Sequence, residues 1–426
     1  MKQLQALLVH PPIFDFTAYD FWLRPYGMMR AAARFASACR FTFFDYLTTV
    51  KKDTWGRGRI EGTIIAKPDA FSDIPRRFRR FGKPRAEFQD LLRAHAFDVA
   101  LIQTSMTYWY PGVMEVIEDI RALQPAAKIV LGGVYATLCT EHAATLGADI
   151  VIQGANLAPL YQLLNFDPTR EMPLGNIPGC GAAAELPQNI RNNVGIMKLG
   201  DGCPFSCSYC ASPIMWNGFT PRGLDECVGD FRRLVAAGAK DIAFYDDALL
   251  YRADDALLPF LDAVSAETVG RRRVRFHTPN ALNARFVTPH LARRMVDAGF
   301  SGIFLGFESG AQAWQTATGG KVNAGEFEAA VNYLREAGAS AIFAYILAGH
   351  PDAEAQDAEN SIRLARRLGV RVMLSEFSPI PGTVDGLKCA RWADISEPLS
   401  HNKTAFALRR LGAGRLNRLK DMARRN

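Results

Sequence analysis

Three cysteines lie close together in the segment DGCPFSCSYCASP (residues 201–213). They are Cys203, Cys207 and Cys210, and the residues around them are mostly turn formers and serines rather than core residues. Thiolates that lie this close in sequence bind either zinc or an iron–sulfur cluster. Both kinds of site usually take four protein ligands, so the chemistry depends on what supplies the fourth.

A zinc site would need one more ligand from elsewhere in the chain. The sequence has no second C-x-x-C or H-x-x-x-H pair, so His277 or His350 would have to serve alone. A [4Fe–4S] cluster held by three thiolates would instead leave one iron open to a small molecule. The other five cysteines stand singly and are expected to pack as small buried hydrophobes; they are Cys39, Cys139, Cys180, Cys227 and Cys389.

The second half of the chain must position these cysteines. Six short apolar runs alternate with amphipathic helical stretches, a pattern that predicts parallel strands separated by helices. A complete eight-unit barrel usually needs about 250 residues, and too little chain remains for it. We therefore predict an incomplete barrel of six β/α units over residues 194–383, with the cysteines following the first strand. The predicted strands are 194–200, 241–247, 273–279, 302–308, 341–349 and 371–379.

The first half predicts a doubly wound, Rossmann-like parallel sheet over residues 1–165, which would bind ligands at the carboxyl ends of its strands. Residues 48–90 fit this pattern poorly and are interpreted as a long loop or an insertion. Residues 166–193 are rich in Pro, Gly and Asn and predict a linker. Residues 384–426 predict a basic helical extension. The expected strands are 4–10, 40–47, 98–104, 128–133 and 149–154.

Composition places the chain among ordinary globular proteins. It has 426 residues, 49% of them hydrophobic and 22% charged, and no apolar run reaches the ~18 residues of a membrane span. The start, MKQLQALLVHPP, is too short in apolar residues for a signal peptide, so we expect a cytoplasmic protein. The net charge of +7 is concentrated in residues 75–85 and 408–426. These stretches could bind nucleic acid, with Phe78 and Phe81 stacking on bases, but a solvated loop and helix are favoured.

The C-x-x-x-C-x-x-C motif after the first strand of a six-unit barrel resembles the signature of the radical S-adenosylmethionine (radical SAM) superfamily. The resemblance implies a [4Fe–4S] cluster whose open iron takes the amino and carboxylate groups of S-adenosylmethionine (SAM). One electron from the cluster then cleaves SAM into methionine and a 5′-deoxyadenosyl radical. A flavodoxin- or ferredoxin-type electron donor is implied as a partner.

Further segments resemble motifs of the same family. They are the tyrosine before the third cysteine, FYDDALL after the second strand, LGFESG after the fourth and FSPIPGT at the end of the sixth. The loop after the fifth strand, AGHPDAE, matches only in part, so a single glycine is carried over from it. Helix capping is an alternative role for the acidic residues. The implied SAM contacts are Tyr209, Asp246, Asp247, Glu308, Ser309 and Gly349.

The first domain resembles the cobalamin-binding domain that is often fused to such barrels. It lacks the D-x-H-x-x-G segment that supplies a cobalt ligand in many cobalamin proteins, and QGANLA lacks the acids of the frequent G-E-G-E segment. The implied cobalamin contacts lie in QTSMT and LGGVYAT. They are Thr104, Ser105, Gly132 and Gly133. The aromatic residues Tyr108, Trp109 and Tyr110 are expected either against the corrin face or in a packed loop or domain interface.

The resemblance implies a cobalamin-dependent methyltransferase that acts on an unactivated carbon or phosphorus of a small-molecule or anionic substrate. Two alternatives stay open: a non-methylating radical SAM rearrangement, cyclisation or oxidation with a vestigial first domain, and a non-catalytic iron–sulfur sensor that binds nucleic acid. The sequence assigns no catalytic side chain. Arg275 and His277, near the end of the third strand, either face the substrate or are satisfied by hydrogen bonds within the barrel.

Overall fold

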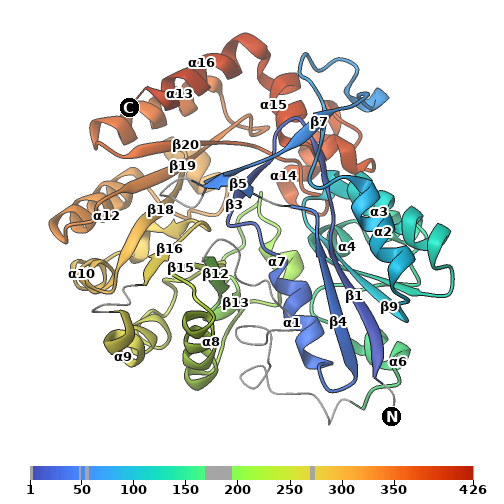
Figure 1. Cartoon of the computed structure of the whole chain (residues 1–426). Coiled ribbons are helices and arrows are strands. Elements are labelled where there is room, and N and C mark those ends of the chain that lie inside the picture. The colour runs from blue at the N-terminus through green and yellow to red at the C-terminus, as the bar shows by residue number, and fades with distance from the viewer. Residues whose placement is uncertain (1–2, 48, 53–56, 168–193, 269–273, 426) are drawn as a thin grey trace. The chain divides into compact units, whose positions relative to one another are not determined.

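The computed structural model describes residues 3–47, 49–52, 57–167, 194–268 and 274–425 (Figure 1). The chain divides into two compact units, Met1–Arg191 with Arg232–Ala237 and Asn192–Phe231 with Gly238–Asn426. Apart from Phe166 and Asp167, the linker predicted for residues 166–193 lies outside the described residues. Of the helices within the described ranges, none is long and apolar enough to cross a membrane.

The first unit is built on a five-stranded parallel sheet, as its buried apolar runs predict. The strand order is β11-β10-β9-β1-β4, and every neighbouring pair is parallel. This order places the ends of β9 and β10 side by side, with Gly133 in register with Thr104. The strands are β1 (Leu4–His10), β4 (Cys39–Asp45), β9 (Val99–Thr104), β10 (Lys128–Gly133) and β11 (Ile150–Val151).

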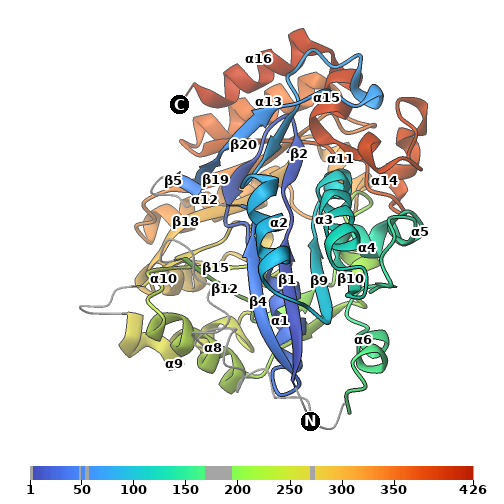
Figure 2. The ribbon, with the colours of Figure 1, turned by 45° about the vertical axis from the view of Figure 1, so that its right-hand side comes forward.

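Helices cover both faces of this sheet because side chains of a strand alternate between its faces. In β1, Leu7 and Val9 pack in one apolar core with α2 (Arg85–Ala94) and α3 (Tyr110–Leu123). Ala6 and Leu8 pack in a second core with α1 (Tyr26–Arg34) and α6 (Ala158–Leu163). Figure 2 shows α2 and α3 together on one side of the strands. The doubly wound fold predicted from the sequence is confirmed.

The described residues between 49 and 81 form short antiparallel strands, as an insertion would, rather than a long loop. The sequence did not reveal these strands because their runs of three or four residues are too short to show a clear alternation. The basic segment also packs differently from a nucleic-acid contact, since Phe78 and Phe81 are buried and Phe16 lies edge-on to the Phe78 ring at 5.3 Å. The antiparallel strands of this region, with their partners near the amino terminus, are β2 (Ile13–Asp15), β3 (Tyr19–Phe21), β5 (Thr49–Lys52), β6 (Arg57–Ile60), β7 (Gly62–Ile64) and β8 (Arg79–Phe81).

The second unit is the predicted incomplete barrel of six successive parallel strands. They pair in chain order, β12-β15-β16-β18-β19-β20, and a two-residue strand, β17 (Leu282–Asn283), also pairs with β18. All carboxyl ends therefore lie on one side of the sheet, where the cysteine-bearing loop begins. The six strands are β12 (Val194–Met197), β15 (Asp241–Phe244), β16 (Arg275–His277), β18 (Phe300–Glu308), β19 (Ile342–Ala348) and β20 (Arg371–Glu376).

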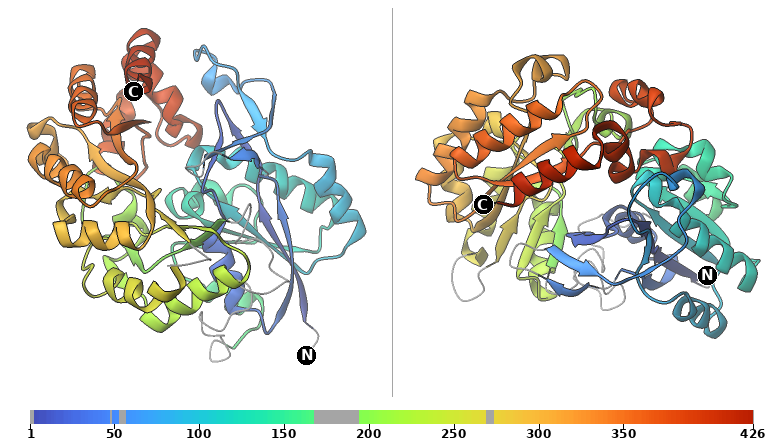
Figure 3. Two further views of the ribbon diagram at one scale, coloured as in Figure 1. Left: turned by 60° about the vertical axis from the view of Figure 1, so that its left-hand side comes forward. Right: turned by 90° about the horizontal axis from the view of Figure 1, so that it is seen from above.

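Helices follow the strands and lie along the outer side of the curved sheet (Figure 3). Local signals fix where several of them begin. Thr288 caps α10 with its side chain, and Asn323 and Glu326 form a reciprocal capping box at the start of α12. The helices are α8 (Leu224–Ala236), α9 (Leu257–Thr268), α10 (Pro289–Asp297), α12 (Ala324–Glu336) and α13 (Ala355–Arg367).

The end of the chain is helical and packs onto the second unit. It contains α14 (Val384–Leu387), α15 (Lys403–Leu411) and α16 (Ala413–Arg424), and α16 contacts β20 and α13. Part of its positive charge is paired with barrel carboxylates: Arg418 with Glu359 at 2.6 Å and Lys420 with Glu376 at 2.5 Å. These basic side chains therefore stabilise the packing of the extension.

Candidate active site

The three cysteines lie on one loop after β12, beside the hairpin of β13 (Gly200–Gly202) and β14 (Phe219–Pro221). Cys207 is buried, whereas Cys203 and Cys210 are half-buried. The Cys210 amide donates to the Cys207 carbonyl at 3.0 Å, which closes the turn between these two thiols. Burial, together with the neighbouring thiols, raises the pKa of Cys203 and of Cys207. Binding of a metal cation would offset the cost of ionising these buried thiols, because a bound metal deprotonates its thiol ligands.

The donor set suits an iron–sulfur cluster better than a mononuclear zinc site. In the part of the chain that the structure describes, no three His, Cys, Asp or Glu side chains converge as the ligands of a single metal ion would. Each thiolate of a cluster binds a different iron atom, so convergence on one point is not required. His277 and His350, the candidates for a fourth zinc ligand, form hydrogen bonds to Asp241 and Asp385 instead.

Asp246 holds the backbone that leads into the cysteine loop. Its Oδ1 accepts the amides of Leu199 and Gly200 at 2.9 and 2.8 Å, so it caps a turn before the cysteines rather than the helix that follows it. Its Oδ2 is buried with no hydrogen-bond partner among the described residues. Burial raises the pKa of Asp246 to about 7. The neighbouring Asp247 is half-buried and lies 3.5 Å from the Lys198 ammonium.

Glu308 ends β18 in a strained conformation. Its φ of +60° lies in the left-handed region, where residues other than glycine are uncommon, and the pairing of β18 with β19 shifts register beside it. Such strain is found at functional sites when the surrounding structure enforces it. Here the Glu308 carboxylate is held 3.1 Å from the Lys321 ammonium. Ser309 is buried, and its hydroxyl accepts the Ala311 amide at 3.2 Å.

Lys321 is a functional candidate that the sequence reasoning missed. Its side chain is only 19% exposed. Burial lowers the pKa of Lys321, but the negative charges of Glu308 and of the Cys207 and Cys210 thiolates outweigh burial and raise it. The ammonium is therefore a fixed positive charge beside the thiols. No local sequence pattern pairs Lys321 with Glu308, so the sequence offered no signal for this contact.

Two other predicted SAM contacts are packed within the unit. The ring of Tyr209 stacks on Trp314 with centroids 5.7 Å apart and planes inclined by 20°. The ring also packs against the apolar cluster that contains Phe377, while its hydroxyl is hydrogen-bonded to the Cys207 thiol. Gly349 follows β19, and a Cβ there would lie 3.4 Å from Ala407 of α15. That is an ordinary van der Waals distance, and the φ of +86°, in the left-handed region, accounts for this glycine without a ligand.

Arg275 and His277 form a structural network at the other end of the barrel. Both bond to the carboxylate of Asp241, the first residue of β15, with Arg275 Nε at 2.7 Å and His277 Nε2 at 2.8 Å. Burial raises the pKa of Asp241, but these hydrogen bonds outweigh it and bring the value to about 2. Of the two interpretations left open by the sequence, the hydrogen-bonded histidine is the one observed.

In the first unit, the four predicted cobalamin contacts come together where β9 and β10 end. Thr104 is fully buried, and its hydroxyl accepts the Ala136 amide at 3.0 Å, which positions α4 (Val134–Leu138). Gly133 has a φ of +115°, and a Cβ there would lie 2.2 Å from the Thr104 carbonyl. Gly132 has room for a Cβ, and Ser105 is half-buried.

Apolar side chains project beside these turns. Met106 is 46% exposed and Val134 is 37% exposed. The three aromatic residues that follow are packed: Tyr108 is buried, Trp109 donates to Asp15 at 2.9 Å, and Tyr110 stacks on Tyr135. All three side chains are therefore packed within the first unit, in a short 3-10 helix (Thr107–Trp109) and at the start of α3, and their contact with a corrin stays a prediction.

Residues 197–374 match the family model described as the radical SAM superfamily. The matched segment contains the cysteine loop and extends from the end of β12 into β20. The matched part of the barrel is thus similar to a radical SAM domain over these residues. A radical SAM domain implies a [4Fe–4S] cluster and SAM as cofactors, which agrees with the three thiols on this loop.

Solved structures resemble both units together. The chain is similar to the radical SAM methyltransferase TsrM from Kitasatospora setae, solved with tryptophan substrate and a SAM analogue, with a TM-score of 0.66, 15% identity and coverage of 91% of this chain and 76% of that one. The cobalamin-dependent SAM radical enzyme OxsB gives a TM-score of 0.59 at 11% identity, with coverage of 91% and 55%. The chain therefore has the two-unit fold of these cobalamin-containing radical SAM structures.

The curated relatives match a smaller share of this chain than the solved structures do. The ribosomal protein uS12 methylthiotransferase RimO from Pseudothermotoga lettingae is 29% identical over 122 residues, which are 27% of this chain and 26% of that protein. The threonylcarbamoyladenosine tRNA methylthiotransferase MtaB from Thermotoga maritima is 24% identical over 284 residues, 64% of each chain. The matches thus cover less than two thirds of each relative.

Proposed function

We propose that this protein is a cobalamin-dependent radical SAM methyltransferase that acts on a poorly reactive carbon or phosphorus of a small-molecule substrate. The observation that carries the proposal is the pairing of two sites in one chain. One is a three-thiol loop at the carboxyl ends of a radical SAM barrel. The other is a parallel sheet whose strand ends offer glycines, a hydroxyl and exposed apolar side chains.

The barrel residues would act on SAM through position and charge. Cys203, Cys207 and Cys210 would hold the cluster, which supplies the electron that cleaves SAM. The Lys321 ammonium and the Glu308 carboxylate carry the opposite charges that the carboxylate and amino groups of SAM require. Because both are mostly buried, their interactions are less screened by water than surface pairs. Asp246 keeps the start of the cysteine loop in place through two backbone amides.

The first unit would hold cobalamin, which supplies methyl transfer when it is bound. A corrin presents a broad, largely apolar face and polar side chains at its rim. Met106 and Val134 offer exposed apolar contacts, and Ser105 offers a hydroxyl beside them. The close approach of β9 to β10 at Gly133 keeps these turns together. The TsrM and OxsB structures, which were solved with cobalamin bound, support this assignment by fold.

Methyl transfer is favoured over the methylthio transfer named for the curated relatives. Sulfur insertion commonly uses a second cluster, and the sequence has no second group of three cysteines. The five remaining cysteines stand singly, and burial raises the pKa of Cys39 to about 11 and of Cys389 to about 12, as expected of inert buried thiols.

The test is anaerobic reconstitution of the full chain with iron and sulfide, with and without hydroxocobalamin, followed by reaction with dithionite and SAM. We expect a [4Fe–4S] absorbance spectrum, retention of about one corrin per chain, and formation of 5′-deoxyadenosine and S-adenosylhomocysteine. Formation of 5′-deoxyadenosine with no retained corrin would replace methyl transfer by a rearrangement or oxidation. An intact cluster that never cleaves SAM would contradict the enzyme assignment.

A further inference from the structure

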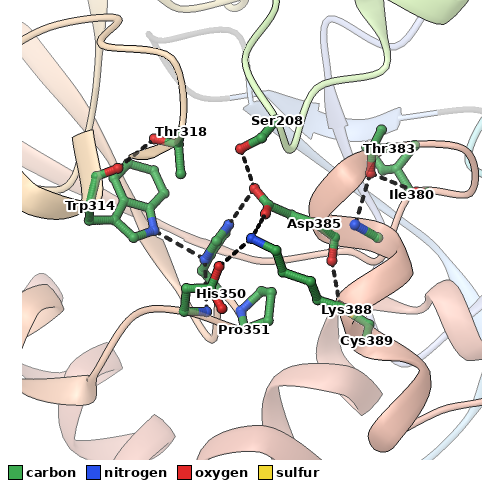
Figure 4. A network of polar contacts seen from close by, with 12 residues as sticks. Ser208, Trp314, Thr318, His350, Pro351, Ile380, Thr383, Asp385, Lys388 and Cys389 are labelled. Atoms are coloured by element: carbon green, nitrogen blue, oxygen red, sulfur yellow. Dashed lines mark hydrogen bonds and ion pairs between the residues drawn. The ribbon is translucent and has the colours of Figure 1, made fainter. Parts of the chain in front are cut away.

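A buried carboxylate in the second unit joins the cysteine loop to the loops that follow three other strands (Figure 4). Asp385 lies in α14, after β20, and its side chain is 0% exposed. Its Oδ2 accepts the Ser208 hydroxyl and, at 2.9 Å, His350 Nε2. Its Oδ1 accepts Lys388 Nζ at 2.7 Å. Asp385 lies just after the FSPIPGT segment and outside the family motifs of the sequence.

The charge of Asp385 is compensated from three directions. Burial raises the pKa of this carboxyl, but hydrogen bonds from Lys388, Ser208 and His350 outweigh burial and lower it. An ionised carboxylate accepts hydrogen bonds only, so each of these three groups donates to it. Charge-assisted hydrogen bonds are about twice as strong as neutral ones. The Asp385 carboxylate therefore fixes the positions of the three side chains that donate to it.

His350 links Asp385 to the loops that follow β18 and β19. The indole N–H of Trp314, in α11 (Gln312–Ala317), donates to His350 Nδ1 at 3.0 Å, and the Asp352 amide donates to the same nitrogen at 3.1 Å. Since Nδ1 accepts, Nε2 must carry the proton that is donated to Asp385. Burial lowers the pKa of His350, which agrees with a neutral ring.

Every polar group of Ser208 forms a hydrogen bond. Its amide donates to the Thr318 carbonyl at 3.2 Å, its carbonyl accepts the Asp385 amide at 3.1 Å, and its hydroxyl donates to the Asp385 carboxylate. Ser208 follows Cys207 directly and stands two residues before Cys210. Fixing Ser208 therefore fixes the segment that carries two of the three cluster thiols.

We propose that Asp385 is a positioning residue for the iron–sulfur cluster, which holds Ser208 and thereby sets the placement of Cys207 and Cys210. The inference rests on the cluster assigned above to these cysteines. Asp385 does not touch the cluster or SAM in this account. It acts through Ser208, so its loss disturbs how the cluster is held and how SAM binds to it, beyond any loss of stability.

Asp241 offers a matched control within the same unit. It is also a buried carboxylate that accepts a histidine Nε2 and a cationic side chain, but it lies at the amino end of β15. Asp385→Asn and Asp241→Asn remove the same charge from similar surroundings. Ser208→Ala removes only the hydroxyl link and keeps both main-chain bonds, and Ser378→Ala is its control, because Ser378 donates to the His401 carbonyl.

The experiment uses the full chain reconstituted anaerobically with iron and sulfide. It measures the electron paramagnetic resonance spectrum of the reduced cluster with and without SAM, the KM for SAM in 5′-deoxyadenosine formation, and the thermal midpoint. We expect Asp385→Asn to change the spectrum and raise KM by at least about tenfold, and Ser208→Ala to raise KM about threefold. Asp241→Asn should lower the thermal midpoint while the spectrum and KM stay as in wild type, and Ser378→Ala should leave both readouts unchanged.

The proposal is overturned if Asp385→Asn keeps the wild-type spectrum and KM, or if Asp241→Asn changes them equally. If Asp385→Asn fails to fold, Ser208→Ala decides: a wild-type spectrum and KM in that variant overturn the proposal. A wild-type protein that loads no cluster, or loads one and does not cleave SAM, would instead contradict the proposed function, so the two failures are distinguishable.

Discussion

At the carboxyl ends of the barrel strands, charged side chains are buried in ion pairs and hydrogen bonds, and Glu308, Lys321, Asp246 and Asp385 are the main examples. At the carboxyl ends of β9 and β10 in the first unit, the residues are glycines, hydroxyls and exposed apolar side chains. Both edges belong to parallel sheets, whose ligands bind at the carboxyl ends of the strands. The two edges nevertheless differ in the ligand chemistry that they suit.

The difference agrees with the two cofactors proposed above, which differ in charge and size. Buried charges interact strongly because little water screens them, which suits a small zwitterion beside a cluster of thiolates. Apolar contacts grow with the area they cover, which suits a broad ring with few charges at its face. Substitutions at the two edges should therefore affect SAM cleavage and corrin retention separately, and the largest effect is expected at the cysteine loop.

The largest effect is expected from Cys203→Ala. Loss of one of three thiolates should reduce 5′-deoxyadenosine formation to background, more than about 100-fold below wild type. Corrin retention should be unchanged, because the first unit has its own core. Chromatography of products and the corrin absorbance measure the two effects. Cys39→Ala, a buried cysteine of the first unit, is the control, and equal loss of cleavage in both variants would refute a role specific to the loop.

Gly133→Ala should produce the reverse pattern. A Cβ at this position would lie 2.2 Å from the Thr104 carbonyl, and the φ of +115° disfavours any side chain. We expect a stability loss on the order of 2 kcal/mol and at least about tenfold weaker corrin retention, while SAM cleavage persists. Gly147→Ala, at the turn before β11, imposes a similar backbone strain at a φ of +88°, but it is not a predicted corrin contact and should retain corrin. Equal retention by both variants would show that this turn does not shape the site.

Lys321→Met should weaken SAM binding within the barrel. The variant leaves the Glu308 carboxylate buried without its cation, which costs on the order of 2 kcal/mol of stability, and it removes the positive charge proposed to meet SAM. We expect KM for SAM to rise about tenfold. Lys420→Met breaks another ion pair of a buried glutamate and should leave KM unchanged. A similar KM shift in both would indicate a general loss of packing.

The smallest effect concerns the amino end of the barrel. Because the folded pKa of Asp241 is about 2, below the ordinary value for an aspartate, its ionised form stabilises the fold above about pH 4. That contribution, roughly 2 kcal/mol, is lost as the pH falls toward 2. Urea unfolding of cluster-free protein between about pH 5 and pH 3 should show a steeper decline for wild type than for Asp241→Asn. Parallel declines would contradict this assignment.

The sequence predicted the architecture well because the evidence for it is periodic. Six buried runs separated by amphipathic helices define an open parallel barrel, and the C-x-x-x-C-x-x-C spacing places the cysteines on one loop whatever the details of packing. The insertion at residues 48–90 was harder, since three-residue strands carry no readable alternation. Its antiparallel pairing depends on contacts with β2 and β3 that only the tertiary structure reveals.

Residue roles were less predictable than residue positions. Asp246 and Ser309 were expected to contact SAM, and the structure shows that their polar atoms bond to backbone amides; whether they also meet SAM stays a prediction. Lys321 and Asp385 went unnoticed because each acts on a residue far away in sequence: Lys321 on Glu308 and Asp385 on Ser208. An ion pair or a hydrogen bond between residues separated in sequence leaves no local pattern.

The most direct test of methyl transfer uses SAM labelled with a trideuterated methyl group, supplied to the reduced, reconstituted chain with bound corrin. We predict S-adenosylhomocysteine in an amount equal to the corrin, with the labelled methyl group recovered on the corrin by mass spectrometry. Cys203→Ala should keep this label transfer while losing 5′-deoxyadenosine. A corrin that is retained but never labelled, while 5′-deoxyadenosine still forms, would contradict the methyltransferase assignment.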